Sequence, residues 1–209
     1  LCRNRTCVNS MHLEPVTALV SRVGADLGFA HDGDADRVLA VDEVGNEIDG
    51  DFMGVISAID LKKRGTLPGD TFVSTVMANM GLDVALSAHG IKVVKTAVGD
   101  RYVLEEMRAG GYTLGGEQSG HVIFLDHNTT GDGLITALQI ASIVKRAGKP
   151  LSEVASVMTR YPQVLVNVRV TDKNAVAANA VVNDAIVEAE ERLGGKGRVL
   201  VRASGTESL

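Results

Sequence analysis

Apolar runs of strand length alternate with segments of helical spacing, and this order constrains the fold more than any other feature. The strand-like runs are short and rich in apolar residues, and they lie at 26–31, 38–42, 71–76, 91–96, 112–114 and 121–125. Segments of helical spacing, several ended by glycine, lie at 51–64, 79–89, 101–109, 132–146 and 151–159. A repeating strand–helix order predicts an α/β fold on a mostly parallel sheet. The first two runs should be neighbouring strands or hairpin arms, with a turn at Gly45-Asn46.

The last part of the chain has a different pattern. Residues 164–170 alternate as a half-exposed strand does, 174–193 have the spacing of an amphipathic helix, and 198–202 have the composition of another strand. This strand–helix–strand order predicts a small α+β domain. We therefore expect three segments, 1–50, 51–160 and 161–209.

Charge and apolar content exclude two classes of partner. The net charge is −5 and acids and bases are mixed, so the chain has no basic stripe for nucleic acid. No apolar run approaches the roughly 20 residues of a membrane helix, so we expect no membrane partner and a cytoplasmic location. Any phosphate would have to be bound by local features such as helix ends, glycine-rich loops or single arginines.

The run Asp32-Gly33-Asp34-Ala35-Asp36-Arg37 directly follows a strand-like segment. Three carboxylates so close together repel one another unless a cation compensates them. Hard oxygen ligands suit Mg²⁺ or Ca²⁺, and Arg37 adds a fixed positive charge where a phosphate could bridge metal and guanidinium. The sequence therefore predicts a metal site formed by Asp32, Asp34 and Asp36.

Three other interpretations of this run stay open. It could be a solvated acidic turn, or a strand followed by a dehalogenase-type aspartate nucleophile. It also fits part of an EF-hand, with Asp32, Asp34 and Asp36 at positions one, three and five and Glu43 at position twelve. Against the EF-hand, its sixth position requires glycine and here is Arg37, and the flanking segments are strand-like.

The glycine-rich run Gly115–His121 lies between two strand-like segments. Alternation would present Glu117, Ser119 and His121 on one side, and a carboxylate, a hydroxyl and an imidazole can bind sugar hydroxyls or an amine. A plain turn is the structural alternative. A catalytic Ser–His pair is a weaker one, because no nucleophile-elbow pattern surrounds Ser119.

Two further loops offer polar groups. Arg202, Ser204, Gly205 and Thr206 form a small phosphate-binding pattern of guanidinium, hydroxyls and amides, although a plain turn is as good an explanation. The segment 95–102 joins a strand to a helix, a common place for ligand contacts in α/β sheets. Its residues Asp100 and Arg101 are candidate catalytic groups, and Asp100 could equally be a helix N-cap.

These motifs, in this order, resemble those of the α-D-phosphohexomutase superfamily. DGDADR at Asp32–Arg37 resembles its metal loop, GGEQSGH at Gly115–His121 its sugar-binding loop, and RASGTE at Arg202–Glu207 its phosphate-binding loop. The similarity extends over nearly the whole chain. It implies phosphohexomutase-type α/β domains with mixed sheets and a C-terminal α+β domain: the end of the second domain, the third, and most of a fourth.

The resemblance also implies an activity. Gln118 is typical of the branch that acts on glucosamine phosphates, whereas the glucose- and mannose-phosphate branch usually has methionine there. The implied reaction interconverts glucosamine 6-phosphate and glucosamine 1-phosphate through a bisphosphorylated intermediate and a phosphoserine enzyme of the isomerase class. Its cofactor would be Mg²⁺, held by Asp32, Asp34 and Asp36 together with the phosphoserine.

The roles implied for the remaining residues concern substrate binding. The implied partners are a hexosamine phosphate and the bisphosphate intermediate, and a homodimer of the full-length protein is also compatible. Arg37 would stabilise the phosphoryl charge. The sugar would be bound by Glu117, Ser119 and His121, and its non-transferring phosphate by Arg202, Ser204, Gly205 and Thr206.

The chain departs from the family pattern in places. The family nucleophile lies in a TASHNP-like motif of the first domain, which does not occur here, and neither Ser119 nor Ser204 replaces it. Cys2–His12 matches loosely, and Ser208 stands where the family usually has proline. We therefore expect a fragment that is inactive alone and supplies the metal, sugar and phosphate sites. A phosphomannomutase/phosphoglucomutase, a non-catalytic sugar-phosphate binding fragment and a Ca²⁺-binding structural protein are the alternatives.

Overall fold

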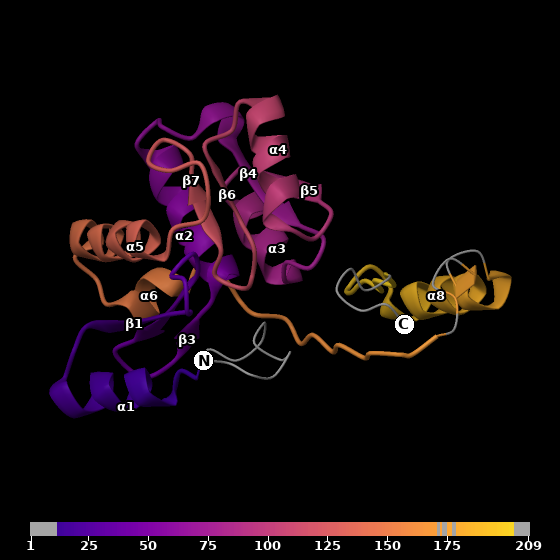
Figure 1. The fold of residues 1–209 in the computed structure, drawn as a ribbon, viewed down its shortest axis with the longest axis horizontal. Coiled ribbons are helices and arrows are strands. Elements are labelled where there is room, and N and C mark those ends of the chain that lie inside the picture. The colour runs from indigo at the N-terminus through magenta and orange to yellow at the C-terminus, as the bar shows by residue number, and fades with distance from the viewer. Residues whose placement is uncertain (1–11, 171, 173–174, 177–178, 203–209) are drawn as a thin grey trace. The chain divides into compact units, whose positions relative to one another are not determined.

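A computed structural model describes residues 12–170, 172, 175–176 and 179–202. The chain divides into two compact units, Leu1–Tyr161 and Pro162–Leu209. The boundary expected near residue 50 stays a prediction. The first unit (Figure 1) contains α1 (Glu14–Val23), β1 (Leu27–His31), β2 (Val38–Asp42), β3 (Glu47–Ile48), α2 (Gly50–Lys63), η1 (Pro68–Asp70), β4 (Thr71–Thr75), α3 (Met80–Ala88), β5 (Lys92–Thr96), α4 (Asp100–Gly110), β6 (Leu114–Gly116), β7 (Val122–Phe124), α5 (Gly133–Ala147) and α6 (Leu151–Ala155).

The first sheet is antiparallel, in the order β1–β2–β3. Strands β1 and β2 pair with Leu27 opposite Asp42, so the connection of this hairpin is the acidic loop 32–37. The turn at Gly45 joins β2 to β3 instead, because the Asp42 carboxylate accepts the backbone N–H of Asn46 (2.7 Å) and tightens the chain there. The two strands are hairpin arms as expected, but the turn between them is the acidic one.

The second sheet is mixed, in the order β5–β4–β6–β7. Strand β4 is parallel to β5 and β6, and β7 is antiparallel to β6. Parallel strands place their carboxyl ends at the same edge, so the loops that follow Thr75, Thr96 and Gly116 begin there together. The expectation of α/β layers with mixed sheets is confirmed.

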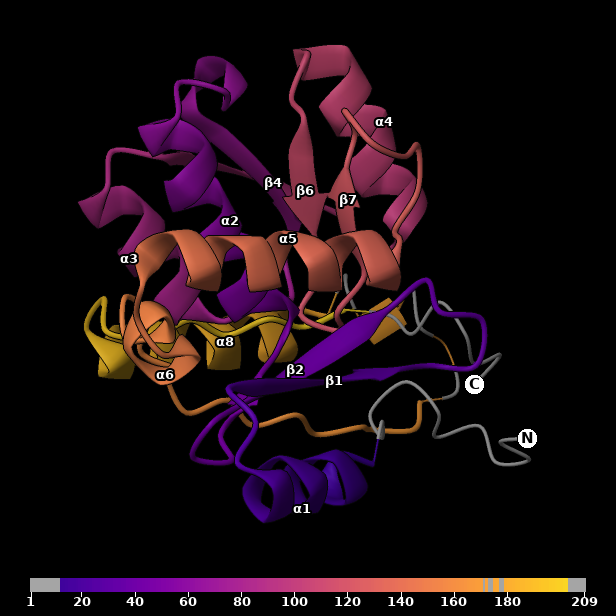
Figure 2. The same cartoon turned by 90° about the vertical axis from the view of Figure 1, so that its left-hand side faces the viewer.

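Helices cover both faces of the second sheet. Phe72 of β4 packs in a cluster with residues of α2 and α3, whereas its neighbour Val73 packs with Val103 and Met107 of α4. Helix α5 contacts β2 of the first sheet and β7 of the second, and Figure 2 shows it between the two sheets. The acidic loop and the second sheet therefore belong to one packed unit.

Polar side chains fix where several helices begin. Asp49, Asn79 and Asp132 each accept a backbone N–H of the following turn, as N-caps do. Helix α1 was not predicted from the sequence. Its boundaries are ordinary, with proline in the first turn and Gly24 in the left-handed region (φ 64°). Val16, Val20 and Val23 lie at helical spacing, although Val20 is its one buried residue.

The second unit contains helix α8 (Ala180–Leu193), which confirms the latter part of the helix expected over 174–193. The strands expected at 164–170 and 198–202 are wrong for the residues described there, which have no regular secondary structure. The physical reason is that a strand requires a hydrogen-bonded neighbour. Val164 and Val168 are instead 86% and 74% exposed.

Among the described helices, none is both long and apolar enough to cross a bilayer.

Candidate functional site

The three aspartates predicted to bind metal lie together in the loop between β1 and β2. One carboxylate oxygen of each of Asp32, Asp34 and Asp36 lies within 4.8 Å of the others. Ala35 has a left-handed backbone (φ 60°), and its carbonyl accepts the N–H of Gly133 at the start of α5 (2.9 Å). Helix α5 thus holds the turn that keeps the three carboxylates close.

The carboxylates of this loop repel one another. Burial, then the hydrogen bond and charge of Asp32 and the charge of Asp34, raise the pKa of Asp36. The Arg37 side chain adds one positive charge, with its Nε 3.9 Å from Asp36 Oδ1. A divalent cation would offset the repulsion, and an all-carboxylate donor set fits Mg²⁺ or Ca²⁺.

The EF-hand alternative is wrong. Strands β1 and β2 flank the acidic loop, where an EF-hand has helices. Glu43, the residue expected at position twelve, lies just beyond the far end of β2. Its carboxylate accepts the backbone N–H of Ser152 (3.2 Å) and the hydroxyl of the same residue at the start of α6.

The glycine-rich loop between β6 and β7 is joined to the acidic loop by main-chain contacts. The N–H of Val38, directly after the acidic loop, donates to the carbonyl of Gly120 (3.2 Å). Gly120 has φ +92°, and a Cβ there would lie 2.2 Å from the Val38 carbonyl oxygen. A side chain at this position would push the two loops apart.

The predicted sugar-binding side chains occupy different environments in this loop. Glu117 Oε1 accepts the N–H of Gly99 (3.1 Å). The Ser119 hydroxyl is buried and, within the described part of the chain, has no hydrogen-bond partner. His121 is 2% exposed, and its Nε2 lies 3.8 Å from Asp36 Oδ2. The structure thus brings His121 beside the acidic loop, whereas Glu117 contacts the segment that begins α4.

The candidates Asp100 and Arg101 begin helix α4 at the carboxyl edge of the second sheet. Asp100 is not the N-cap: that position is Gly99, whose backbone (φ 136°) needs glycine. The Arg101 guanidinium pairs with Glu105 one turn along α4 (2.7 Å), and both side chains are exposed. Gly99, through its bond to Glu117, links this segment to the glycine-rich loop.

Sequence reasoning missed a buried polar group at the base of the glycine-rich loop. Asp49 is 4% exposed and accepts from Arg160 Nη2 (2.8 Å) and Gln118 Nε2 (3.5 Å). Asp51, 1% exposed, accepts the N–H of Asn79 (2.7 Å). The order Asp-Gly-Asp before an apolar helix could have indicated the N-cap. Nothing in the sequence indicated the partners, because Arg160 lies far along the chain.

The carboxyl group of Asp51 has an unusual pKa. Burial, and next the charge of Asp49, raise it to about 7, against the opposing effects of the Asn79 N–H and of Lys95 and Arg160. Asp51 Oδ1 is buried and, among the described residues, has no hydrogen-bond partner, which is consistent with a protonated acid near neutral pH.

Replacing this acid by its neutral isostere, Asp51→Asn, should change how stability depends on pH. Because the folded pKa is raised, Asp51 keeps its proton in the native protein between about pH 4 and about pH 7, whereas it loses the proton in the unfolded chain. The parent protein therefore loses stability as the pH rises through this window. The difference in unfolding free energy, variant minus parent, should rise over that window by up to roughly 4 kcal/mol and then level off. Urea unfolding of both proteins at a series of pH values measures it; a constant difference would contradict the assignment.

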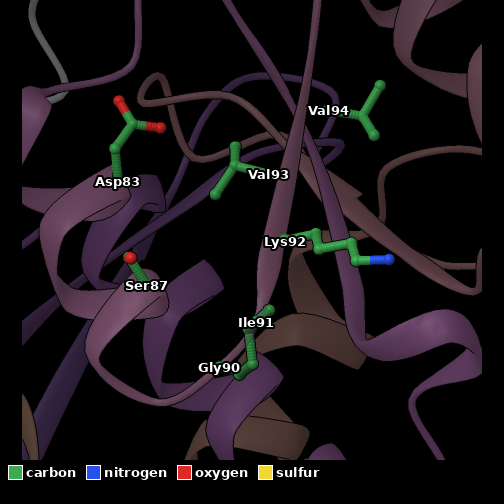
Figure 3. A pocket seen from close by; sticks show the side chains of 7 residues that line it. All are labelled: Asp83, Ser87, Gly90, Ile91, Lys92, Val93 and Val94. Carbon is green, nitrogen blue, oxygen red and sulfur yellow. The ribbon is translucent and has the colours of Figure 1, made fainter.

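An open pocket also lies at the edge of the second sheet, and Figure 3 shows its lining. It is formed by Asp83 and Ser87 of α3 together with Gly90, Ile91, Lys92, Val93 and Val94. None of the predicted site residues lines it.

The predicted phosphate-binding loop is only partly described. Arg202 is exposed in the second unit, and Ser204, Gly205 and Thr206 lie outside the described residues.

Comparison with protein families places the chain in one of them. The phosphoglucomutase/phosphomannomutase alpha/beta/alpha domain III matches residues 49–161, and the C-terminal domain of the same family matches residues 165–209. The chain therefore belongs to the phosphoglucomutase/phosphomannomutase family, which agrees with the resemblance of its three loops.

Within this family, the chain is similar to several phosphoglucosamine mutases. The chain is 59% identical over 202 residues to the phosphoglucosamine mutase of Geobacillus kaustophilus, a match that covers 97% of this chain and 45% of the relative. It is 57% identical over 200 residues to that of Geotalea daltonii, covering 96% of this chain and 44% of the relative. The chain thus spans less than half the length of these relatives.

Solved structures share the fold. A phosphoglucomutase/phosphomannomutase family protein from Burkholderia thailandensis superposes with a TM-score of 0.63 at 28% identity, covering 73% of this chain and 32% of that one. The Aspergillus fumigatus N-acetylphosphoglucosamine mutase, solved with GlcNAc-6P and magnesium, gives a TM-score of 0.72 at 22% identity, covering 86% and 46%. At that identity the second similarity concerns the fold alone.

Proposed function

We propose that this chain forms the metal, sugar and phosphate sites of a phosphoglucosamine mutase, which interconverts glucosamine 6-phosphate and glucosamine 1-phosphate through a bisphosphorylated intermediate. The observation that carries the proposal is the contact between two loops: Asp36 of the acidic cluster lies 3.8 Å from His121 of the glycine-rich loop. A divalent cation and a sugar phosphate could therefore be bound side by side. The identity to relatives of that name supports the choice of sugar.

Asp32, Asp34 and Asp36 would hold Mg²⁺, which when bound supplies positive charge against the transferring phosphoryl group. Arg37 would add a second positive charge beside it. Its Nε has no hydrogen-bond partner within the described residues, and the side chain is 30% exposed, so the guanidinium could turn toward a phosphate oxygen. His121, buried against Asp36, would hold that carboxylate in place, and a direct contact of His121 with the sugar stays a prediction.

Glu117 and Ser119 would bind the sugar hydroxyls or the amine. The hydroxyl of Ser119 is a buried polar group without a partner in the described chain, and such a group is costly unless a ligand or water satisfies it. Glu117 keeps one oxygen on the Gly99 N–H and can use the other for substrate. Arg202, Ser204, Gly205 and Thr206 would bind the non-transferring phosphate, and the phosphoserine would come from sequence outside these 209 residues.

The test is a substrate comparison in a full-length protein that carries this chain. We expect turnover of glucosamine 1-phosphate with Mg²⁺, at a kcat/KM at least tenfold above that for glucose 1-phosphate or mannose 1-phosphate. Comparable turnover of the three sugars would contradict the choice of glucosamine, and binding without turnover would favour a sugar-phosphate binding module. The cytoplasmic location and the homodimer stay predictions.

A further inference from the structure

The main chain of the glycine-rich loop is hydrogen-bonded to the start of helix α2. The N–H of Gly50, the first residue of α2, donates to the carbonyl of Gln118 (3.1 Å). The fit is close, because a Cβ on Gly50 would lie 2.0 Å from the Glu117 carbonyl oxygen. Glu117 and Ser119 flank the residue that is held, so the position of both depends on where α2 begins.

Asp49 determines that position. Its Oδ1 accepts the N–H groups of Asp51 (3.1 Å) and Phe52 (3.2 Å), which fixes the first turn of α2. Its Oδ2 faces the glycine-rich loop and lies 3.5 Å from Gln118 Nε2, at the long end of hydrogen-bond distance. One carboxylate therefore contacts both the helix and the loop.

Arg160 supplies the positive charge that stabilises the buried Asp49 carboxylate. Burial raises the pKa of Asp49, and the Arg160 guanidinium, 2.8 Å from Oδ2, opposes that effect. The guanidinium also lies over the Phe52 ring, 5.4 Å from its centroid, which holds it on the first turn of α2. A buried carboxylate without such a partner would be strongly destabilising.

Arg160 is itself held in place by its neighbour. The Asn79 side chain accepts the N–H of Tyr161 (2.9 Å) and donates to the carbonyl of Tyr161 (2.8 Å). Asn79 also caps α3 by accepting the N–H of Gly81 (3.0 Å). The segment that carries Arg160 is thus tied to the rigid start of a second helix.

We propose that Asp49 is a positioning residue for the sugar-binding loop: with Arg160 as its counter-ion, it fixes Gln118 and so orients Glu117 and Ser119 toward the substrate. Asp49 would act without touching the substrate, through the loop. The proposal rests on the proposed function, because it assigns Glu117 and Ser119 to the sugar.

The experiment uses two variants in a full-length protein that carries this chain. Asp49→Ser keeps an N-cap hydroxyl for α2 but removes the oxygen that faces Gln118 and Arg160. Gln118→Leu removes the amide donor and leaves the cap intact. We expect the KM for glucosamine 1-phosphate to rise about tenfold or more in Asp49→Ser and severalfold in Gln118→Leu, with a smaller change in kcat, because misplaced binding groups weaken ground-state contacts.

Asp60→Asn is the matched control. Asp60 is also on α2 and also accepts from an arginine, Arg146 (2.8 Å), but it belongs to the other end of the helix. The control should lower the melting temperature and leave KM unchanged. If Asp49→Ser does not fold, Gln118→Leu decides alone. A KM within twofold of the parent in either folded variant would overturn the proposal.

Hydrogen exchange separates this proposal from the proposed function. The Gly50 amide, which donates to Gln118, should exchange faster in both variants and at the parental rate in Asp60→Asn. If the parent protein turned over none of the hexose phosphates, the proposed function would fail, yet faster exchange of Gly50 would still show that Asp49 positions the loop. An active parent with unchanged Gly50 exchange in the variants would overturn the positioning role alone.

Discussion

Changing Asp32, Asp34 and Asp36 together to asparagine should abolish metal-dependent stabilisation of this chain and, under the proposed function, the mutase activity of a full-length protein that carries it. The parent chain should gain about 2.7 kcal/mol of stability at a Mg²⁺ concentration one hundred times the dissociation constant, and the triple variant should gain none. Activity in the full-length protein should fall on the order of 10³-fold or more, because charge neutralisation is the main protein contribution to phosphoryl transfer. Thermal melts with and without Mg²⁺, and an activity assay, measure the two effects.

Without metal, the same triple substitution should not lower the stability of the chain. Burial, and next the neighbouring acids, raise the pKa of Asp36, so the native loop carries a desolvation cost and a repulsion that the amides remove. Metal-free stability should therefore stay equal or rise. The control replaces three exposed acids of α8, Glu188, Glu190 and Glu191, by glutamine. It changes net charge equally and should leave the metal response intact. A Mg²⁺-dependent shift that survives in the aspartate variant would exclude this loop as the metal site.

Gly120→Ala should destabilise the protein by about 3 kcal/mol or more and separate the glycine-rich loop from the acidic loop. Two costs combine: a left-handed backbone (φ +92°) and a Cβ 2.2 Å from the Val38 carbonyl oxygen. If the chain relieves the clash by moving, the hydrogen bond from Val38 to Gly120 is lost, and sugar-phosphate affinity should fall with it. Urea unfolding and calorimetry with glucosamine 1-phosphate measure both.

Gly111→Ala separates backbone strain from crowding. Gly111 also has a left-handed backbone (φ +68°), but a Cβ there would meet nothing within 4 Å. Its variant should lose only about 1 kcal/mol and bind the sugar phosphate normally. Equal losses in the two variants would mean that the contact between Gly120 and Val38 adds nothing.

Most local elements could be predicted from the sequence, and the exceptions have physical causes. The strands before and after the acidic loop, and the helices from α2 to α5, follow from apolar runs, glycines and N-caps. The alternation at 164–170 was misleading, because it indicates which face a strand would bury and says nothing of whether a partner strand is present. Helix α1 is a different case: Val16, Val20 and Val23 lie at helical spacing and Gly24 follows, so the sequence does contain the signals for it.

The candidate site also has a part that could be predicted from the sequence and a part that could not. The spacing of Asp32, Asp34 and Asp36 indicated a cation site, because three carboxylates on alternate residues remain close in any compact loop. The neighbourhood of that loop was not predictable: the Val38–Gly120 and Asp36–His121 contacts join residues far apart in the chain. Such contacts depend on how the two sheets pack against α5.

The sequence by itself thus determined the chemistry that each loop offers, because residue type and spacing fix charge, donors and backbone freedom locally. The tertiary structure decided which loops share a site and what supports them. Asp49 shows the difference most clearly. In the sequence it is an N-cap before an apolar helix; in the fold it joins Gln118 and Arg160, because burial brings together groups that would otherwise lie unpaired in a low-dielectric interior.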